Sequence, residues 1–449
     1  MAANETPWLL PLVGPLARLI TNAYYRVTVA GPPIPRSDPL LLVANHPNMV
    51  FDPLLVAAAA GRPVRMLAKA PLFRIPLVGT VLRLAGCLPV YRPRDDPSLA
   101  NRNEATFAAV IDALGRGAAV AIFPEGTSHD APALAPLKTG AARLALGASS
   151  RGLPLAVVPV GLVMADRDRA RSEALVVVGA PVRWDDLRGT PPDDAAAVRD
   201  MTDRIGGALS AVTVNLDAWA DEPLVTTAEA VYAATHVVDP DPADRVRRLW
   251  VATGMLRRLR ELGDERYAPL AAAVAAHGRR LAQLGLTPVD LAEPTDLETA
   301  LRWTGRRVPL LLAGGMALLG LLLVSGPMIL ADVATRAAGA DQSERATRHL
   351  FTGAVLVVLW WLVLAGIGVA TGGWTAGLGL AVLLPVVGIG GLAVQQAWAV
   401  RLRQARRWLL LRFGSERRRR LLADQATIAR QLDDIVAHPP AGAPPTRVA

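Results

Sequence analysis

Cysteine is almost absent from this 449-residue chain, because Cys87 is the single one. One cysteine cannot form an intrachain disulfide, and it excludes any metal site built from several cysteines. We expect Cys87 to be a small, buried, apolar side chain. Aromatic residues are also scarce, at 5% of the chain, and no nucleic-acid-binding motif is present. Nucleic acid is therefore not expected as a partner, although the net charge is +9.

The N-terminal stretch lacks the basic leader of a secretory signal peptide. Residues 7–20 are apolar but contain three prolines, so we expect a helix at or near a membrane instead. The positive net charge suits an anionic membrane surface or phosphorylated substrates. Lysine is nearly absent among the 48 basic residues. The two lysines, Lys69 and Lys138, both fall near the motifs described below.

Short apolar runs alternate with helical stretches from about residue 20 to residue 215. This alternation favours an α/β domain, in which a sheet is flanked by helices and the functional groups lie at strand ends. The pattern predicts strands at 25–30, 40–45, 64–68, 118–123, 155–161 and 174–179, and helices at 52–60, 100–115, 137–148 and 193–212.

Long hydrophobic runs are confined to the C-terminal part of the chain, at 308–331, 350–371 and 375–398. Each exceeds 20 residues, which at about 1.5 Å per residue spans a hydrocarbon core of roughly 30 Å. Tryptophans lie near their ends (Trp303, Trp374 and Trp398), as is common at membrane interfaces. Core helices of a soluble protein are the alternative interpretation, but they rarely run so long without charge.

The flanking charges do not fit a simple topology. Arg306 and Arg307 precede the first run, and nine arginines lie between Arg401 and Arg420. Both flanks are therefore expected on the cytoplasmic side, which requires an even number of crossings. Because Gly326-Pro327 interrupts the first run, we expect two or three of the segments to enter the membrane. The arginine cluster is either a solvated helix face or a contact with anionic lipid headgroups.

Four regions follow from these patterns. We expect the α/β domain over residues 1–215, a helical region over 216–305 and a membrane domain over 306–400. A basic helix and a disordered, proline-rich tail are expected over 401–449.

A histidine and a carboxylate follow the predicted strand at 40–45. His46 comes directly after this apolar run, and Asp52 lies six positions further on. An imidazole held by a carboxylate can remove a proton from an alcohol, which is general-base catalysis. Asp52 followed by Pro53 is also an ordinary helix start, with the aspartate as N-cap. The two roles are compatible.

A second cluster, Phe123-Pro124-Glu125-Gly126-Thr127-Ser128, follows the predicted strand at 118–123. Two strand ends can face one cleft, so the two clusters together indicate an acyl-transfer site. His129 and Asp130 come next, but adjacent loop residues seldom act on the same atom. We therefore interpret His129 and Asp130 as structural.

Five blocks along the chain, in their order and spacing, resemble the glycerolipid acyltransferases of the PlsC type. The resemblance covers about residues 20–215 and implies a mixed sheet with flanking helices. It also implies transfer of a fatty acyl group from a thioester to a glycerol phosphate or a lysophospholipid. The blocks are Asn45-His46 with Asp52; Lys69 to Phe73 with Gly79, Gly86 and Leu88 to Arg92; Phe123 to Ser128; Leu137 to Ala142; and Val158 to Gly161.

The resemblance assigns roles to individual residues. It implies that His46 is the base and Asp52 its partner, and that Arg92 meets the acceptor phosphate. The segment Glu125, Gly126 and Thr127 would bind the glycerol-phosphate portion, and Pro159 would shape the acyl-donor side. Lys138 is either a second phosphate contact or a surface or helix-cap residue. No metal or cofactor is expected, and coenzyme A or acyl carrier protein would leave from the donor.

The spacing between His46 and Asp52 departs from the usual pattern of the family, and the sequence around it is similar to one subgroup. Five residues separate His46 from Asp52, where most members of the family have four, so a bulge or loop must absorb the extra residue. The strings around both clusters are similar to yeast-type acyltransferases that act on glycerol 3-phosphate and dihydroxyacetone phosphate. This similarity favours glycerol 3-phosphate as the acceptor of a membrane-bound enzyme whose catalytic domain faces the cytoplasm. A lysophosphatidate acyltransferase, a thioesterase and a non-catalytic lipid-binding protein are the alternatives.

Overall fold

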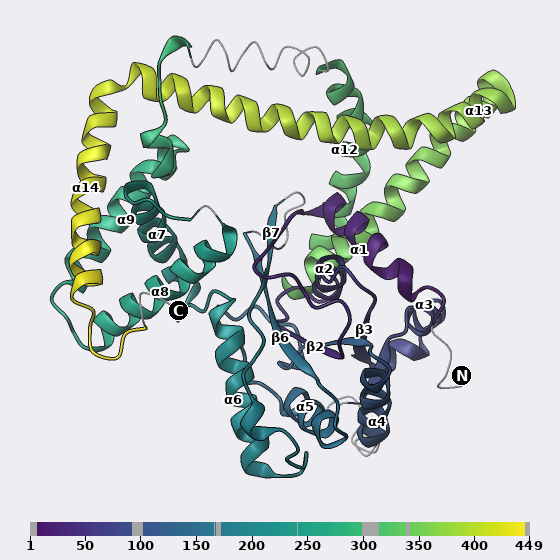
Figure 1. Cartoon of the computed structure of the whole chain (residues 1–449). Coiled ribbons are helices and arrows are strands. Elements are labelled where there is room, and N and C mark those ends of the chain that lie inside the picture. The colour runs from purple at the N-terminus through teal and green to yellow at the C-terminus, as the bar shows by residue number, and fades with distance from the viewer. Residues whose placement is uncertain are drawn as a thin grey trace. The chain divides into compact units, whose positions relative to one another are not determined.

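The computed structural model describes residues 7–91, 102–165, 167, 172–239, 241–298, 314–337 and 342–444 (Figure 1). Two compact units are present. The first comprises residues 1–219, 239–253 and 342–346, and the second comprises 220–238, 254–341 and 347–449. The four-region division expected from the sequence stays a prediction.

A seven-stranded mixed sheet forms the centre of the first unit, in the order β1-β7-β6-β2-β5-β3-β4. Within the described sheet, neighbouring strands are parallel except for the antiparallel pair β6 and β7. The predicted mixed sheet is confirmed, and the short strand β4 is an addition to the six expected strands. The strands are β1 (Arg26–Ala30), β2 (Leu40–Ala44), β3 (Val64–Lys69), β4 (Leu88–Val90), β5 (Ala119–Ile122), β6 (Ala156–Met164) and β7 (Glu173–Val178).

Helices cover both faces of this sheet (Figure 1). Every residue of β2 is apolar and buried, as expected for a central strand with helices on both sides. Leu41 and Val43 point into a cluster formed with α4, α5 and α6, and the alternate residues point to the opposite face. The described helices of this unit are α1 (Leu10–Tyr24), α2 (Phe51–Ala59), α3 (Val78–Leu84), α4 (Arg102–Gly115), α5 (Gly140–Ser150) and α6 (Ala195–Ala211).

Strand register brings the two sequence clusters to one edge of the sheet. Val43 of β2 is paired with Ile122 of β5 in a parallel ladder, so both strands end at the same level. Ala44 is paired with Val160 of β6 on the other side of β2. The residues that follow β2 and β5 therefore emerge side by side, at the carboxyl edge where ligands of open α/β sheets bind.

In the second unit, helices α7 (Glu222–Thr235), α9 (Tyr267–Leu284) and α14 (Ser415–Ala437) pack together. Ion pairs join α14 to its neighbours: Arg280 with Asp424 at 2.6 Å and His236 with Asp433 at 3.0 Å. Part of the arginine cluster also contacts protein, since Arg407 pairs with Asp290 at 2.9 Å. Helix α8 (Pro242–Glu261) contributes residues to both units.

Helices α12 (Gly314–Ala337) and α13 (Gln342–Phe413) lie in the second unit, apart from the first five residues of α13. They contain windows long and apolar enough to cross a membrane, Leu318–Thr335 and Thr352–Gly388. Helix α13 is interrupted at Gly373, whose φ of 76° and ψ of −179° are not helical. The predicted segments 350–371 and 375–398 are thus the two arms of α13 on either side of Gly373. The arms pack closely, because a Cβ on Gly377 would overlap Val369. Trp303, Arg306 and Arg307 lie outside the described residues.

Candidate active site

His46 and Asp52 form the predicted pair. The His46 Nδ1 atom lies 2.8 Å from Asp52 Oδ2, and the imidazole ring stacks on Phe123 with centroids 4.3 Å apart. Since the ionised carboxylate accepts hydrogen bonds, Nδ1 carries the proton and Nε2 is left as the basic nitrogen. The pair therefore has the arrangement of a general base with its orienting carboxylate.

Asp52 is completely buried, with 0% of its surface exposed. Burial raises the pKa of Asp52 above the ordinary 3.8, while hydrogen bonds from His46 and the Asn48 backbone and the charge of Arg167 oppose this rise. The Asn48 N–H donates to the same Oδ2 atom at 2.6 Å. The buried carboxylate is thus directed at one ring nitrogen, and water does not compete for that oxygen.

The five-residue spacing between His46 and Asp52 is accommodated by a turn before α2. Both Phe51 N–H and Asp52 N–H donate to the Asn48 carbonyl, at 2.9 and 3.3 Å. Met49 has a φ of +26°, in the left-handed region that residues other than glycine seldom adopt. Asp52 lies inside the first turn of α2, because the N-cap is Val50. The expectation that Asp52 caps this helix is therefore wrong: its side chain is turned to His46.

Asn48 itself is held by the start of the sheet. Its side-chain amide donates to the Tyr25 hydroxyl at 2.7 Å, and that hydroxyl donates to the Arg167 carbonyl at 2.5 Å. Tyr25 and Asn48 are buried. This chain of hydrogen bonds fixes the turn that carries the Asp52 contact.

Asn45 fastens the end of β2 to β6. Its amide group donates to the Leu162 carbonyl at 3.0 Å, and its carbonyl oxygen accepts from Leu162 N–H at 2.7 Å. The side chain thereby replaces one step of the backbone ladder. His46 consequently starts from a backbone that is fixed on one side by β6.

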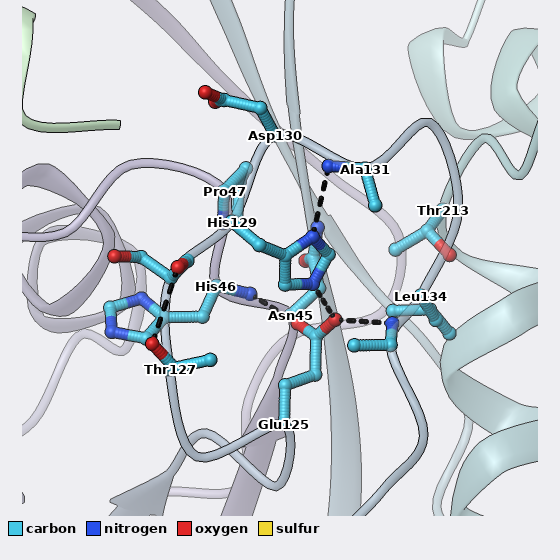
Figure 2. A network of polar contacts seen from close by, with 12 residues as sticks. Asn45, His46, Pro47, Glu125, Thr127, His129, Asp130, Ala131, Leu134 and Thr213 are labelled. Carbon is cyan, nitrogen blue, oxygen red and sulfur yellow. Dashed lines mark hydrogen bonds and ion pairs between the residues drawn. The ribbon is translucent and has the colours of Figure 1, made fainter. Parts of the chain in front are cut away.

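Glu125 enters the same site from β5 (Figure 2). One carboxylate oxygen accepts from His46 N–H at 2.7 Å. The other accepts from Ala135 N–H at 2.8 Å and contacts His129 Nε2. The Glu125 side chain is 1% exposed. Both of its oxygens therefore have protein partners, and one partner is the backbone of His46.

A further charged group, the guanidinium of Arg167, lies beside the Glu125 loop. The Arg167 guanidinium pairs with Asp130 at 3.0 Å and lies over the Trp219 ring, 5.2 Å from its centroid. The indole N–H of Trp219 donates to the Asp130 carbonyl at 2.7 Å. The side chains of His129 and Asp130 thus have different partners, Glu125 for the imidazole and Arg167 for the carboxylate.

The remaining predicted residues lie around this centre. Gly126 has a φ of +74°, and a Cβ there would meet the stem of Lys138 at 3.4 Å. Thr127 and Lys138 are exposed, and the Lys138 N–H donates to the Pro124 carbonyl at 2.7 Å. Pro159 is buried in β6, in register with Val43. Arg92 lies outside the described residues.

Cys87 is half-buried, and burial raises the pKa of its thiol to about 11. The thiol is therefore uncharged near neutral pH, when it is a poor nucleophile. Among the residues that the structure describes, no group of three or more histidine, cysteine, aspartate or glutamate side chains could hold a metal ion.

Nothing in the sequence indicated that Tyr25, Asn48 and Arg167 belong to the site. Asn45 was named only as part of a motif, and His129 was interpreted as structural. One signal was present, because Glu125 and His129 are four residues apart and such a pair can meet on one turn of chain. The others come from distant segments, and only the fold brings them together.

A family model described as Acyltransferase matches residues 26–163. We refer to these matched residues as the acyltransferase domain. This acyltransferase domain contains both sequence clusters, the β2 and β5 strand ends and most of β6. The resemblance inferred from the blocks is confirmed.

Two relatives of this region are named for acyl transfer to glycerol phosphates. Glycerol-3-phosphate O-acyltransferase 2 of Saccharomyces cerevisiae is 33% identical over 190 residues, covering 41% of this chain and 25% of the yeast protein. A chloroplastic 1-acyl-sn-glycerol-3-phosphate acyltransferase of Arabidopsis thaliana is 27% identical, covering 31% of this chain and 38% of that protein. The chain therefore spans a quarter of the length of the yeast relative.

Among solved structures, the 1-acyl-sn-glycerophosphate acyltransferase PlsC from Thermotoga maritima is similar to this chain. The alignment has 20% sequence identity and a TM-score of 0.34, and it covers 44% of this chain and 76% of that structure.

Proposed function

We propose that this protein is a membrane-bound O-acyltransferase that moves a fatty acyl group from an acyl thioester to the hydroxyl of glycerol 3-phosphate. The observation that supports this most strongly is the His46–Asp52 pair at 2.8 Å, placed at the carboxyl edge of an acyltransferase-family sheet. In this proposal His46 and Asp52 are the catalytic pair.

The proposed reaction is direct transfer. His46 Nε2 takes the proton from the acceptor hydroxyl while the hydroxyl oxygen attacks the thioester carbonyl, and Asp52 stabilises the imidazolium that forms. The C–S bond then breaks, and the imidazolium returns its proton to the leaving thiolate of coenzyme A or acyl carrier protein. A cysteine acyl-enzyme is disfavoured because burial keeps the Cys87 thiol protonated.

Substrate contacts are proposed for the residues that border the pair. Gly126 lets the backbone approach the acceptor closely, since no side chain is present there. Lys138 runs along Gly126 and is exposed, so its ammonium group is available for the acceptor phosphate. Thr127 and Pro159 keep the roles that the family resemblance implies, and Arg92 is proposed as the principal phosphate contact.

A lysophosphatidate acyltransferase is the second candidate function, favoured by the Arabidopsis relative named for that acceptor. The catalytic step is the same for both acceptors. They differ in size, since the lysolipid adds one acyl chain that the site must accommodate.

Membrane attachment is proposed through α12 and α13, with the acyltransferase domain on the cytoplasmic face. The large apolar side chains on α12 and α13 are mostly exposed, as they would be in lipid. Helix α1 also exposes three leucines, Leu12, Leu16 and Leu19, which suit contact with the same membrane. Carbonate extraction that released the protein from membranes would contradict this arrangement.

The test of function is acyl transfer by membranes that contain the protein. Palmitoyl-coenzyme A is supplied with either glycerol 3-phosphate or lysophosphatidic acid, and the lipid products are separated and quantified. Product from glycerol 3-phosphate supports the proposal, product from the lysolipid alone moves the function to the second acylation, and free palmitate in place of either product indicates a thioesterase. A protein that forms none of these products would contradict both proposed acceptors.

A further inference from the structure

Glu125 occupies a position that its implied role as an acceptor contact does not explain. Its side chain is 1% exposed, and its carboxylate oxygens are directed at His46 N–H, Ala135 N–H and His129 (Figure 2). A carboxylate with three partners inside the protein has little capacity left for a hydroxyl of the substrate. The contacts link the β5 loop to the backbone of the proposed base.

The tautomer of His129 determines that its imidazole donates a hydrogen bond to this carboxylate. Ala131 N–H donates to His129 Nδ1 at 3.1 Å, so Nδ1 carries no proton. The ring proton is therefore on Nε2, which donates to Glu125 Oε2. The backbone of Ala131 thus orients an imidazole whose remaining N–H is directed at Glu125.

We propose that His129 is a positioning residue for the acyl transfer: it holds Glu125 so that the carboxylate fixes the His46 backbone, and with it the His46 ring. The pathway runs from Ala131 N–H through His129 and Glu125 to His46 N–H. It complements Asp52, which holds the ring itself at Nδ1. His129 touches no substrate in this proposal, which rests on the proposed function.

Two substitutions separate this role from a merely structural one. In His129→Gln, the side-chain amide group lies near the place of Nε2 and still donates to Glu125, but the acceptor for Ala131 N–H is lost. In His129→Asn, the side-chain oxygen lies near the place of Nδ1 and still accepts from Ala131, but the donor to Glu125 is lost. A residue that served only the turn at 129–131 would tolerate asparagine better than glutamine.

We therefore expect His129→Gln to keep kcat within about 3-fold of the unsubstituted protein, and His129→Asn to lower kcat by about 10- to 100-fold, as for a displaced reacting group. The acceptor KM should change little in either variant, because no substrate contact is removed. His438→Asn provides the matched control, since His438 lies on an exposed part of the second unit. Equal activity of the two His129 variants, the reverse order, or a raised acceptor KM would each overturn the proposal.

Hydrogen exchange gives a readout that does not depend on catalysis. Exchange measured by mass spectrometry over residues 45–50, without substrate, should be faster in His129→Asn than in the unsubstituted protein and in His129→Gln. Unchanged exchange in His129→Asn would contradict the proposal even if the enzyme activity were of another class. The converse result is an unsubstituted protein that shows no acyl transfer while the exchange rates of the variants still differ as expected. That result would refute the proposed function but would support the positioning contact. Where a variant does not fold, His129→Ala assayed with and without added imidazole replaces it, and absence of rescue overturns the proposal.

Discussion

Replacing Asp52 by asparagine removes one charge from the proposed catalytic pair and changes its shape little. Asp52 Oδ2 accepts from both His46 Nδ1 and Asn48 N–H, and the asparagine oxygen can accept from the same two donors. What is lost is the negative charge 2.8 Å from a ring that becomes an imidazolium during the reaction. The corresponding change in a serine protease triad lowers kcat by about 10⁴-fold. We expect a loss of about 10³- to 10⁴-fold, or about 4–5 kcal/mol of transition-state stabilisation.

The same substitution lowers activity but should stabilise the fold increasingly as pH rises. Because burial raises the pKa of Asp52, the folded state binds a proton more tightly than the unfolded state does. The stability contributed at this position therefore falls as pH rises from about 4 through the raised pKa. The asparagine side chain does not titrate, so the melting temperature of Asp52→Asn relative to the unsubstituted protein should increase over that pH range.

The assay combines steady-state acyl transfer at saturating acceptor with thermal unfolding at a series of pH values, in the same detergent for both proteins. A variant that kept more than a tenth of the activity would refute the catalytic role of the Asp52 charge. A melting-temperature difference that moved toward the unsubstituted protein as pH increased would refute the sign of the pKa shift.

Three further substitutions test the supports of the site. Asn45→Ala leaves the Leu162 N–H and carbonyl without their side-chain partners. We expect the free energy of unfolding, measured by urea denaturation, to fall by about 1–3 kcal/mol. An unchanged denaturation midpoint would contradict the proposed link between β2 and β6. Gly126→Ala places a Cβ at a φ of +74° and should cost about 1–2 kcal/mol; a more stable variant would show that the loop adopts another conformation in solution. Leu144→Ala, at a fully buried position, should cost about 3 kcal/mol without changing the acceptor KM; a raised KM would show that α5 contributes to acceptor binding.

Much of the fold follows from local sequence patterns. The predicted strand at 40–45 is β2 (Leu40–Ala44), and the predicted helix at 193–212 is α6 (Ala195–Ala211). These elements carry strong local signals, either an unbroken apolar run or an amphipathic pattern. Strand β4 was missed because its three residues, Leu88–Val90, are too few to produce a periodicity. The sequence indicated the interruption of α13 at Gly373, because the predicted apolar runs end at residue 371 and resume at residue 375.

The part of the site formed by residues that are close together in the sequence could be predicted. His46 and Asp52 are close in sequence and follow a strand, so their pairing could be expected. The contact of Glu125 with His46 N–H depends on β2 and β5 being adjacent and in register, as the pairing of Val43 with Ile122 shows. The Tyr25–Asn48 hydrogen bond likewise requires the end of α1 to lie beside the turn before α2. Such contacts have no local signal, because each joins segments that only the sheet order brings together.

In the proposed mechanism, His46 is the base of an acyl transfer to a glycerol phosphate hydroxyl. The most direct measurement is kcat/KM for glycerol 3-phosphate with palmitoyl-coenzyme A, compared among the unsubstituted protein, His46→Ala and the exposed-histidine control His438→Ala. Base catalysis by His46 predicts product from the unsubstituted protein and from the control, and a loss of at least about 10³-fold in His46→Ala. Product formed equally well by His46→Ala would contradict it.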